Sequence, residues 1–253
     1  MLEKIYTIPV NEAFDYCTEN PTEGCPLCYL YRKLENDEID IMLGAAMMEP
    51  EIRIKTNELG FCGRHFDIMF EKNNRLGLAL ILESHLAETR TKTETGGFMG
   101  SKTAAIAGNL EKLGKTCYVC DRIENSFSKM VENTVYLYDT ESEFRAKLKG
   151  EPYFCLDHTS MLLAAGKAHL NKKRVPEFQT AVADVVNKYF DELKKDVSHF
   201  CKKFDYRYEN EPWGNSKDSV ERAIRFITGD RRLKFEKPKK KTVKVIPGEE
   251  NKG

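Results

Sequence analysis

Cys25-Pro26-Leu27-Cys28 and Phe61-Cys62-Gly63-Arg64-His65 decide the fold of this 253-residue chain, because both motifs occur twice. The first returns 92 residues later as Cys117-Tyr118-Val119-Cys120, and the second returns 93 residues later as Phe154-Cys155-Leu156-Asp157-His158. The two motifs are separated by 33 residues in the first copy and by 34 in the second. A pair of motifs that recurs at almost one offset indicates an internal duplication.

Each repeat offers three thiols and one imidazole, in pairs whose members lie three residues apart. Such pairs face the same way on a tight turn or in the first turn of a helix, and zinc prefers four tetrahedral ligands of this kind. We therefore predict two structural zinc ions held by eight ligands: Cys25, Cys28, Cys62, His65, Cys117, Cys120, Cys155 and His158.

The pairing of these ligands has two solutions. Each repeat contains a complete Cys₃His set, so the expected arrangement is one ion in each repeat, and an exchange of ligands between the repeats is the alternative. The other interpretations are iron–sulfur clusters and redox-active or inert cysteines. The type of ligand and the complete set of four ligands favour zinc over these interpretations. Cys17 and Cys201 lie outside the repeat and are expected to be a spare thiol and a packing residue.

The periodicity of apolar residues predicts an all-α fold. Between the second pair of motifs, apolar residues recur at spacings of three and four, which marks one face of a helix. Arg75 to Glu88 is nearly all apolar and predicts a buried helix. Pro176 to Phe204 predicts a long amphipathic helix whose seam runs from Phe190 to Phe204, and a short final helix should end at Gly229. Only Tyr6 to Val10 resembles a strand.

These elements divide the chain into four segments. We expect a first zinc-binding half at residues 1–92, a linker at 93–101 that contains three glycines, and a second half with the C-terminal helices at 102–230. Residues 231–253 form a basic tail that is expected to be disordered. Residues 231–244 carry a net charge of +7, which leaves about −6 on residues 1–230 because the whole chain is neutral.

The charge distribution and the motifs limit the function classes. An acidic body argues against a broad nucleic-acid surface, so a nucleic-acid partner is expected only through residues 231–244. No signal peptide is recognised, and the most apolar stretch, Leu76 to Leu82, is too short to cross a membrane. We expect a cytoplasmic protein, in which thiols stay reduced and serve metal or redox chemistry.

No catalytic motif accompanies the predicted metal sites. The sequence has no His-Glu-x-x-His, no deaminase signature and no phosphate-binding glycine loop. A closed Cys₃His site also leaves no position for substrate. The interpretation is a zinc-stabilised helical protein that is not an enzyme and that binds a protein partner. The alternative is a thiol-based redox or zinc sensor.

Several further stretches resemble a bacterial family of unknown function. The residues that carry the resemblance are Met47-Met48-Glu49-Pro50, Thr56-Asn57-Glu58, Gly60-Phe61-Cys62, His65, Asn74-Arg75-Leu76-Gly77-Leu78-Ala79-Leu80 and Trp213-Gly214. The resemblance covers roughly residues 1–230 and includes the paired Cys-x-x-Cys and Cys-x-x-His motifs. It implies a bacterial cytosolic protein and supports the same eight ligands, and it implies no activity.

Overall fold

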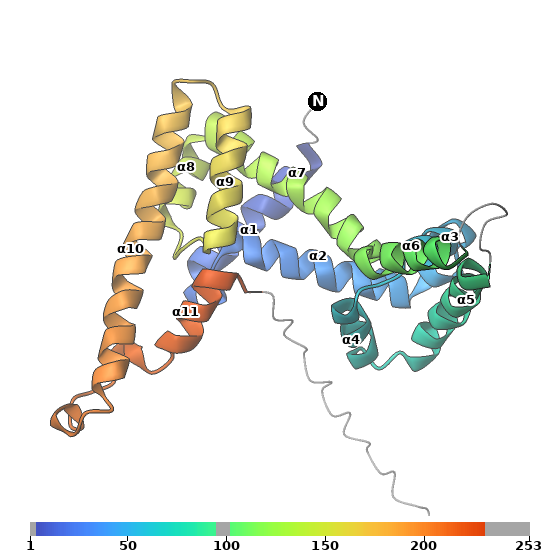
Figure 1. Cartoon of the computed structure of the whole chain (residues 1–253). Coiled ribbons are helices and arrows are strands. Elements are labelled where there is room, and N and C mark those ends of the chain that lie inside the picture. The colour runs from blue at the N-terminus through green and yellow to red at the C-terminus, as the bar shows by residue number, and fades with distance from the viewer. Residues whose placement is uncertain (1–3, 95–101, 231–253) are drawn as a thin grey trace, which may run out of the picture.

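The computed structural model describes residues 4–94 and 102–230, which form eleven α-helices and five short 3-10 turns (Figure 1). No β-strand occurs within these two ranges, so the predicted all-α fold is confirmed. Most of the expected linker and the whole basic tail lie outside the described residues. None of the described helices has a stretch long and apolar enough to cross a bilayer.

The duplication extends over five helices per repeat, more than the motifs alone indicated. In the first repeat the helices are α1 (Thr7–Glu19), α2 (Pro26–Leu43), α3 (Pro50–Leu59), α4 (Gly63–Glu71) and α5 (Arg75–Glu94). In the second they are α6 (Lys102–Lys115), α7 (Tyr118–Thr140), α8 (Ser142–Gly150), α9 (Leu156–His169) and α10 (Arg174–Lys202). Helix α11 (Ser219–Thr228) follows and has no counterpart in the first repeat.

Proline and glycine mark the ends of several helices. Pro26 and Pro50 stand in the first turns of α2 and α3, where a missing N–H costs no hydrogen bond. Gly60 ends α3 with φ 65° and Gly229 ends α11 with φ 75°, a left-handed backbone that glycine adopts without strain. The predicted end of the final helix at Gly229 is confirmed.

Helices α2 and α7 pack against each other in antiparallel directions through the middle of the molecule (Figure 1). The Arg122 guanidinium lies 3.1 Å from the Glu38 carboxylate, and the rings of Phe127 and Tyr31 lie 5.4 Å apart. Residue numbers therefore fall along α2 as they rise along α7. The N-terminus of each helix consequently lies towards the C-terminal end of the other.

The first helix of each repeat packs on the other repeat. The ring of Phe14 in α1 lies 4.8 Å from that of Phe144 in α8. Conversely, α6 packs against α5, and the Asn109 side chain donates a hydrogen bond to the Lys92 carbonyl. The molecule thus has one lobe of α3 to α6 and another of α1 and α8 to α11, which α2 and α7 bridge (Figure 1).

Three sequence expectations need correction. Helix α5 buries one face through Leu78 and Ile81, while Leu76 is 71% exposed, so it is not the buried helix expected at Arg75 to Glu88. Within the expected Phe190–Phe204 seam of α10, Leu193 is the buried member and both terminal phenylalanines are exposed. The strand-like stretch Tyr6 to Val10 lies in η1 (Lys4–Tyr6) and α1, because helix packing overrides the local β propensity.

Candidate metal centres

All four cysteine motifs begin at the N-terminus of a helix. Cys25, Cys62, Cys117 and Cys155 are the N-cap residues of α2, α4, α7 and α9. The second member of each pair stands three residues later, so both side chains lie on the same side of the first turn. The positive end of the helix dipole favours a thiolate at this position.

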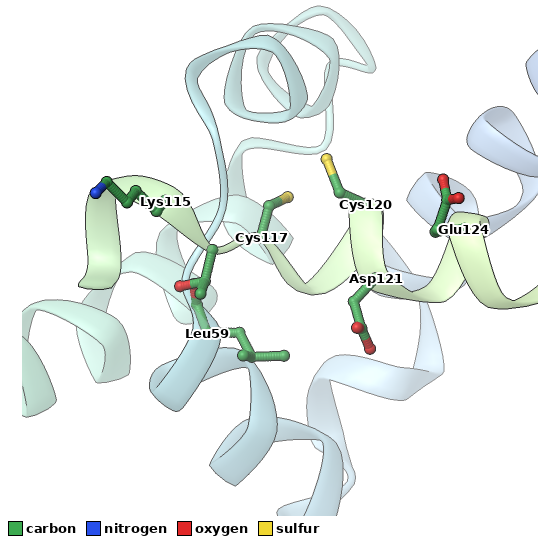
Figure 2. A pocket seen from close by; sticks show the side chains of 7 residues that line it. Leu59, Lys115, Cys117, Cys120, Asp121 and Glu124 are labelled. Atoms are coloured by element: carbon green, nitrogen blue, oxygen red, sulfur yellow. The ribbon is translucent and has the colours of Figure 1, made fainter. Parts of the chain in front are cut away.

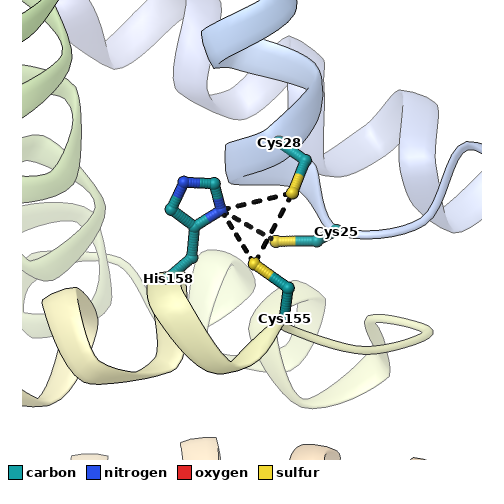
Figure 3. Close-up of side chains that lie close together, drawn as sticks. All are labelled: Cys25, Cys28, Cys155 and His158. Carbon is teal, nitrogen blue, oxygen red and sulfur yellow. Dashed lines mark hydrogen bonds between the residues drawn. The ribbon is translucent and has the colours of Figure 1, made fainter. Parts of the chain in front are cut away.

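One cluster, the inner site, consists of Cys25, Cys28, Cys155 and His158 (Figure 3). The His158 Nδ1 atom lies 3.6, 3.4 and 3.2 Å from the sulfurs of Cys25, Cys28 and Cys155, respectively. The sulfurs of Cys28 and Cys155 are 3.6 Å apart. The three cysteines are 0–1% exposed and His158 is 8% exposed, so solvent is excluded from this cluster.

The second cluster, the outer site, consists of Cys62, His65, Cys117 and Cys120. The His65 Nδ1 atom lies 3.2 Å from the sulfurs of Cys62 and Cys117 and 3.5 Å from that of Cys120. The sulfurs of Cys62 and Cys120 are 3.9 Å apart. Cys117 and His65 are buried, whereas Cys62 is half-buried and Cys120 is exposed.

The structure brings all eight predicted residues into these two clusters, but the expected pairing within each repeat is wrong. Each cluster takes its Cys-x-x-Cys pair from one repeat and its Cys-x-x-His pair from the other. Helix α2 has 18 residues and carries the chain about 27 Å from Cys25, while the ten residues of α3 bring it back at most about 15 Å. Cys62 therefore stays distant from Cys25, and the antiparallel α7 brings Cys117 and Cys120 to it instead.

The donor set and its dimensions fit one tetrahedral metal ion per cluster. Within each cluster the four ligand atoms lie within 4.8 Å of one another. A tetrahedron with metal–sulfur bonds of about 2.3 Å has sulfur–sulfur edges of about 3.8 Å. The sulfur–sulfur distances of 3.6 and 3.9 Å match that edge. Each cluster could hold a metal ion, and both histidines present Nδ1 to it.

The two histidines have different neighbours, although the repeats supply them from equivalent positions. The His65 Nε2 lies 3.2 Å from a carboxylate oxygen of Glu35, which is 0% exposed and accepts two hydrogen bonds from Arg64. The counterpart of Glu35 in the second repeat is Phe127, whose ring lies 5.2 Å from the ring of His158. A carboxylate behind a metal-binding imidazole fixes its orientation and raises its basicity.

The segment that follows α11, Gly229 and Asp230, covers the inner site. The backbone N–H of Asp230 donates to the Cys28 sulfur at 3.2 Å, and Arg32 holds both the carbonyl and the carboxylate of Asp230. A Cβ atom at Gly229 would lie 3.6 Å from the Cys155 sulfur and 3.8 Å from that of Cys28. The chain after α11 therefore passes close to two candidate ligands and donates a hydrogen bond to one of them, Cys28.

Each cluster contains one thiol whose pKa is lowered by hydrogen bonds from its neighbours. Hydrogen bonds from Cys25 and Cys28 lower the pKa of Cys155 to about 4, although burial opposes its ionisation. Burial also opposes ionisation of Cys117, but a hydrogen bond with His65 lowers its pKa to about 6. Burial raises the pKa of Cys25. Sets of thiols that share protons in this way lose them when a metal binds.

The remaining candidate residues stay outside the clusters. Cys17 is buried in α1, where burial raises the pKa of its thiol to about 12, and Cys201 is exposed, so it is not the packing residue expected. Sequence reasoning missed Glu35, Phe127 and Asp230. Glu35 stands seven residues after Cys28 on the same face of α2, and a carboxylate on that face was the available signal.

No curated protein and no solved structure shows a significant match to this chain. The resemblance found in the sequence is confirmed by a family model that spans residues 1–234, a range that includes every described residue. The matching model is described as a family of unknown function (DUF6062), and the chain belongs to this family.

Proposed function

We propose that each cluster binds one zinc ion and that the two ions hold the exchanged repeats together. The observation that carries this proposal is the composition of the clusters, each of which joins a motif of one repeat to a motif of the other. Three thiolates and an imidazole are the ligands that structural zinc takes. A polynuclear iron–sulfur cluster would hold its ligands apart by its own width, and the short distances between ligand atoms favour a single ion.

The inner site would join α2 to α9, and the outer site would join α4 to α7. These links connect segments 127 and 58 residues apart in sequence, between Cys28 and Cys155 and between Cys62 and Cys120. Both ligand sets are complete, so neither ion would have an open position for water or substrate. The proposal is therefore a binding protein that is not an enzyme, and its eight free thiols support a reducing, cytoplasmic location.

Elemental analysis and thermal melts test the structural role of zinc. We expect two zinc ions per chain, and we expect Cys155→Ser to lose one of them and to melt at a lower temperature. Structural zinc contributes about 10–16 kcal/mol of apparent binding free energy, whereas a domain is stable by about 5–15 kcal/mol. Cys201→Ser is the matched control, because Cys201 is an exposed thiol outside both clusters. A Cys155→Ser protein with one zinc and an unchanged melting temperature contradicts the proposal.

The partner that we propose is a protein. Ile224 and Ile227 on α11 are 57% and 56% exposed, and apolar side chains left in solvent are typical of contact surfaces. A double substitution to lysine should keep both zinc ions and abolish specific complexes formed by the native chain. A nucleic-acid partner bound through residues 231–244 predicts instead a salt-dependent complex that is lost when the chain ends at Gly229.

The second candidate function is a thiol-based sensor, and one specific observation favours it. Cys120 is exposed, whereas each of the four inner ligands is buried. An accessible zinc thiolate reacts more readily than a buried one, because reaction requires contact with the oxidant or the competing ligand.

A further inference from the structure

The two candidate metal centres differ in what covers them. At the inner site, the Asp230 N–H donates to the Cys28 sulfur and Gly229 lies over the sulfurs of Cys28 and Cys155. Arg32 fixes this covering segment through two contacts with Asp230, at 3.1 and 3.2 Å. A hydrogen bond to a thiolate lowers its nucleophilicity, and the covering backbone excludes solvent from it.

The outer site has no such cover among the described residues. The repeat places Cys120 where the inner site has Cys28, and it places Glu124 where the inner site has Arg32. Helix α11 belongs to the second repeat alone, and no backbone N–H of the described chain donates to the Cys120 sulfur. An acidic side chain thus replaces the arginine that fixes the cover of the inner site.

A surface hollow of about 350 Å³ opens beside Cys117 and Cys120. Figure 2 shows these cysteines at the N-terminal end of α7, with Asp121 and Glu124 following along the same helix. Lys115 also lines the hollow, and its ammonium group is paired with Glu111. The hollow therefore favours small neutral reagents over anionic ones, because its two carboxylates repel anions.

We propose that the outer site is a peroxide-reactive metal centre that opens at Cys120, while the inner site keeps its metal. This inference rests on the proposed zinc content of the two sites. It assigns different roles to two sites that have the same ligand set: the inner ion holds the fold, and the outer ion is released on oxidation.

The reaction needs one equivalent of a peroxide and two thiolates of the outer site. The Cys120 thiolate attacks one peroxide oxygen, the O–O bond breaks, and sulfenic acid and hydroxide form. The Cys62 thiolate, whose sulfur lies 3.9 Å away, then attacks the sulfenic sulfur. The S–O bond breaks, a second hydroxide leaves and a disulfide forms, so two sulfurs have given two electrons to the peroxide. Only Cys117 and His65 then remain as ligands of the outer site, which are too few to retain a zinc ion, and the ion's oxidation state would not change.

The experiment uses the full chain loaded with zinc and treated with hydrogen peroxide. Zinc release is followed with a chromophoric chelator, and oxidised cysteines are mapped by mass spectrometry. We expect release of one of two ions, a Cys62–Cys120 disulfide and reduced inner cysteines, with rebinding of zinc after reduction. Equal release from both sites, earlier loss from the inner site, or release without oxidation of Cys120 overturns the inference.

A pair of substitutions at one position tests the role of the cover. Asp230→Pro removes the N–H that donates to Cys28, whereas Asp230→Ala keeps it and removes only the carboxylate. We expect peroxide to release the inner ion about tenfold faster from the proline variant than from the alanine variant. Equal rates for the two variants contradict the role of the N–H.

The failure of the proposed function can be told apart from the failure of this inference. Fewer than two zinc ions in the untreated protein contradicts the proposed function. The map of oxidised cysteines then still decides the order of reactivity. Oxidation at Cys62 and Cys120 before the inner cysteines supports the inference, and the reverse order overturns it.

Discussion

The two repeats have similar backbones, but single side chains at equivalent positions give the two metal centres different surroundings. Glu35 and Phe127 occupy equivalent positions, yet one offers a carboxylate to His65 and the other an aromatic ring to His158. Gly24 and Thr116 are also equivalent. A Cβ atom at Gly24 would lie within 3 Å of the ring carbon that bears the Tyr153 hydroxyl, whereas Thr116 donates to the Leu59 carbonyl at 2.6 Å. The repeats therefore share ligands and differ in what surrounds them.

Glu35 provides a prediction about the outer site. Its carboxylate accepts from Arg64 at 2.8 and 2.7 Å and lies 3.2 Å from His65, so Glu35→Ala removes the group that orients this imidazole. Loss of such a partner typically weakens metal affinity by about 10–100-fold, and we expect that loss at the outer site alone. Glu38→Ala is the matched control, because Glu38 lies on α2 like Glu35 but pairs with Arg122 of α7. Competition with a chelator measures both affinities, and an equal effect of the two variants contradicts the assigned role.

Glu151 provides a prediction about pH. Burial raises the pKa of its carboxyl to about 9, against an ordinary value of 4.5, and among the described residues only Thr18 donates a hydrogen bond to it. The folded state binds this proton more tightly than the unfolded state. The associated stability is complete below pH 4.5 and is lost as pH rises towards 9, at about 1.4 kcal/mol per unit as an upper limit.

Glu151→Gln removes this pH dependence because the amide stays neutral. We expect the variant to melt higher than the native chain at about pH 8 and to differ little from it at about pH 5. Glu143→Gln, at an exposed position of α8, is the control and should change neither melting temperature. A native chain with the same melting temperature at both pH values, or a variant that is less stable at the higher pH, contradicts the assignment.

At the scale of elements, helix length decides which motifs meet. The sequence correctly predicted helices between the motifs. It also named the eight residues that the two clusters bring together, and their binding of metal stays a prediction. The expected pairing of ligands within each repeat was wrong, because a repeat unit with four ligands looks complete when its path in space is ignored. The deciding feature is the difference in helix length between α7, which has 23 residues, and α8, which has nine. Because α8 is shorter, the chain does not return to the start of α7, and Cys155 lies far from Cys117.

The sequence also did not predict that α5 and α10 each leave one apolar face exposed. The nearly all-apolar run from Arg75 predicted a buried helix, because apolar residues normally gather in the core. The structure buries Leu78 and Ile81 and exposes Leu76 and Leu86. Composition predicts how apolar a helix is, but only the positions of neighbouring helices decide how much of its surface they cover.

The packing of α9 on α10 provides a prediction at this scale. A Cβ atom at Gly166 would lie 2.5 Å from a ring carbon of Phe178, so the two helices approach closely at this glycine. Gly166→Ala should destabilise the protein by about 1–3 kcal/mol through overpacking, despite the better helix propensity of alanine. Gly108→Ala in α6 meets no atom within 4 Å and should instead stabilise by up to about 1 kcal/mol. Denaturant unfolding measures both changes, and the same sign for the two variants contradicts the packing argument.

At the scale of the whole molecule, the exchange makes the two repeats depend on each other. Residues 1–92 and 102–230 were expected to be separate zinc-binding halves, but each lobe contains helices of both repeats (Figure 1). Helix α1 packs on α8, and both clusters cross between the repeats. The present chain thus resembles two five-helix units that exchange their Cys-x-x-Cys motif and are joined into one polypeptide.

The dependence of the repeats on each other can be tested by dividing the chain. A fragment of residues 1–94 contains Cys25, Cys28, Cys62 and His65, but α2 holds the two pairs apart, so a monomer of it cannot complete a tetrahedral site. The same holds for residues 102–253, in which α7 separates the pairs.

We expect neither fragment alone to form a folded monomer that holds one zinc ion. Coexpression should give a one-to-one complex with two ions and the helical content of the native chain, because each fragment then supplies the ligands that the other lacks. Sedimentation, circular dichroism and zinc analysis of the same samples decide the matter. A monomeric 1–94 fragment that is helical and binds one zinc through four ligands would show that the ligands pair within the repeats after all.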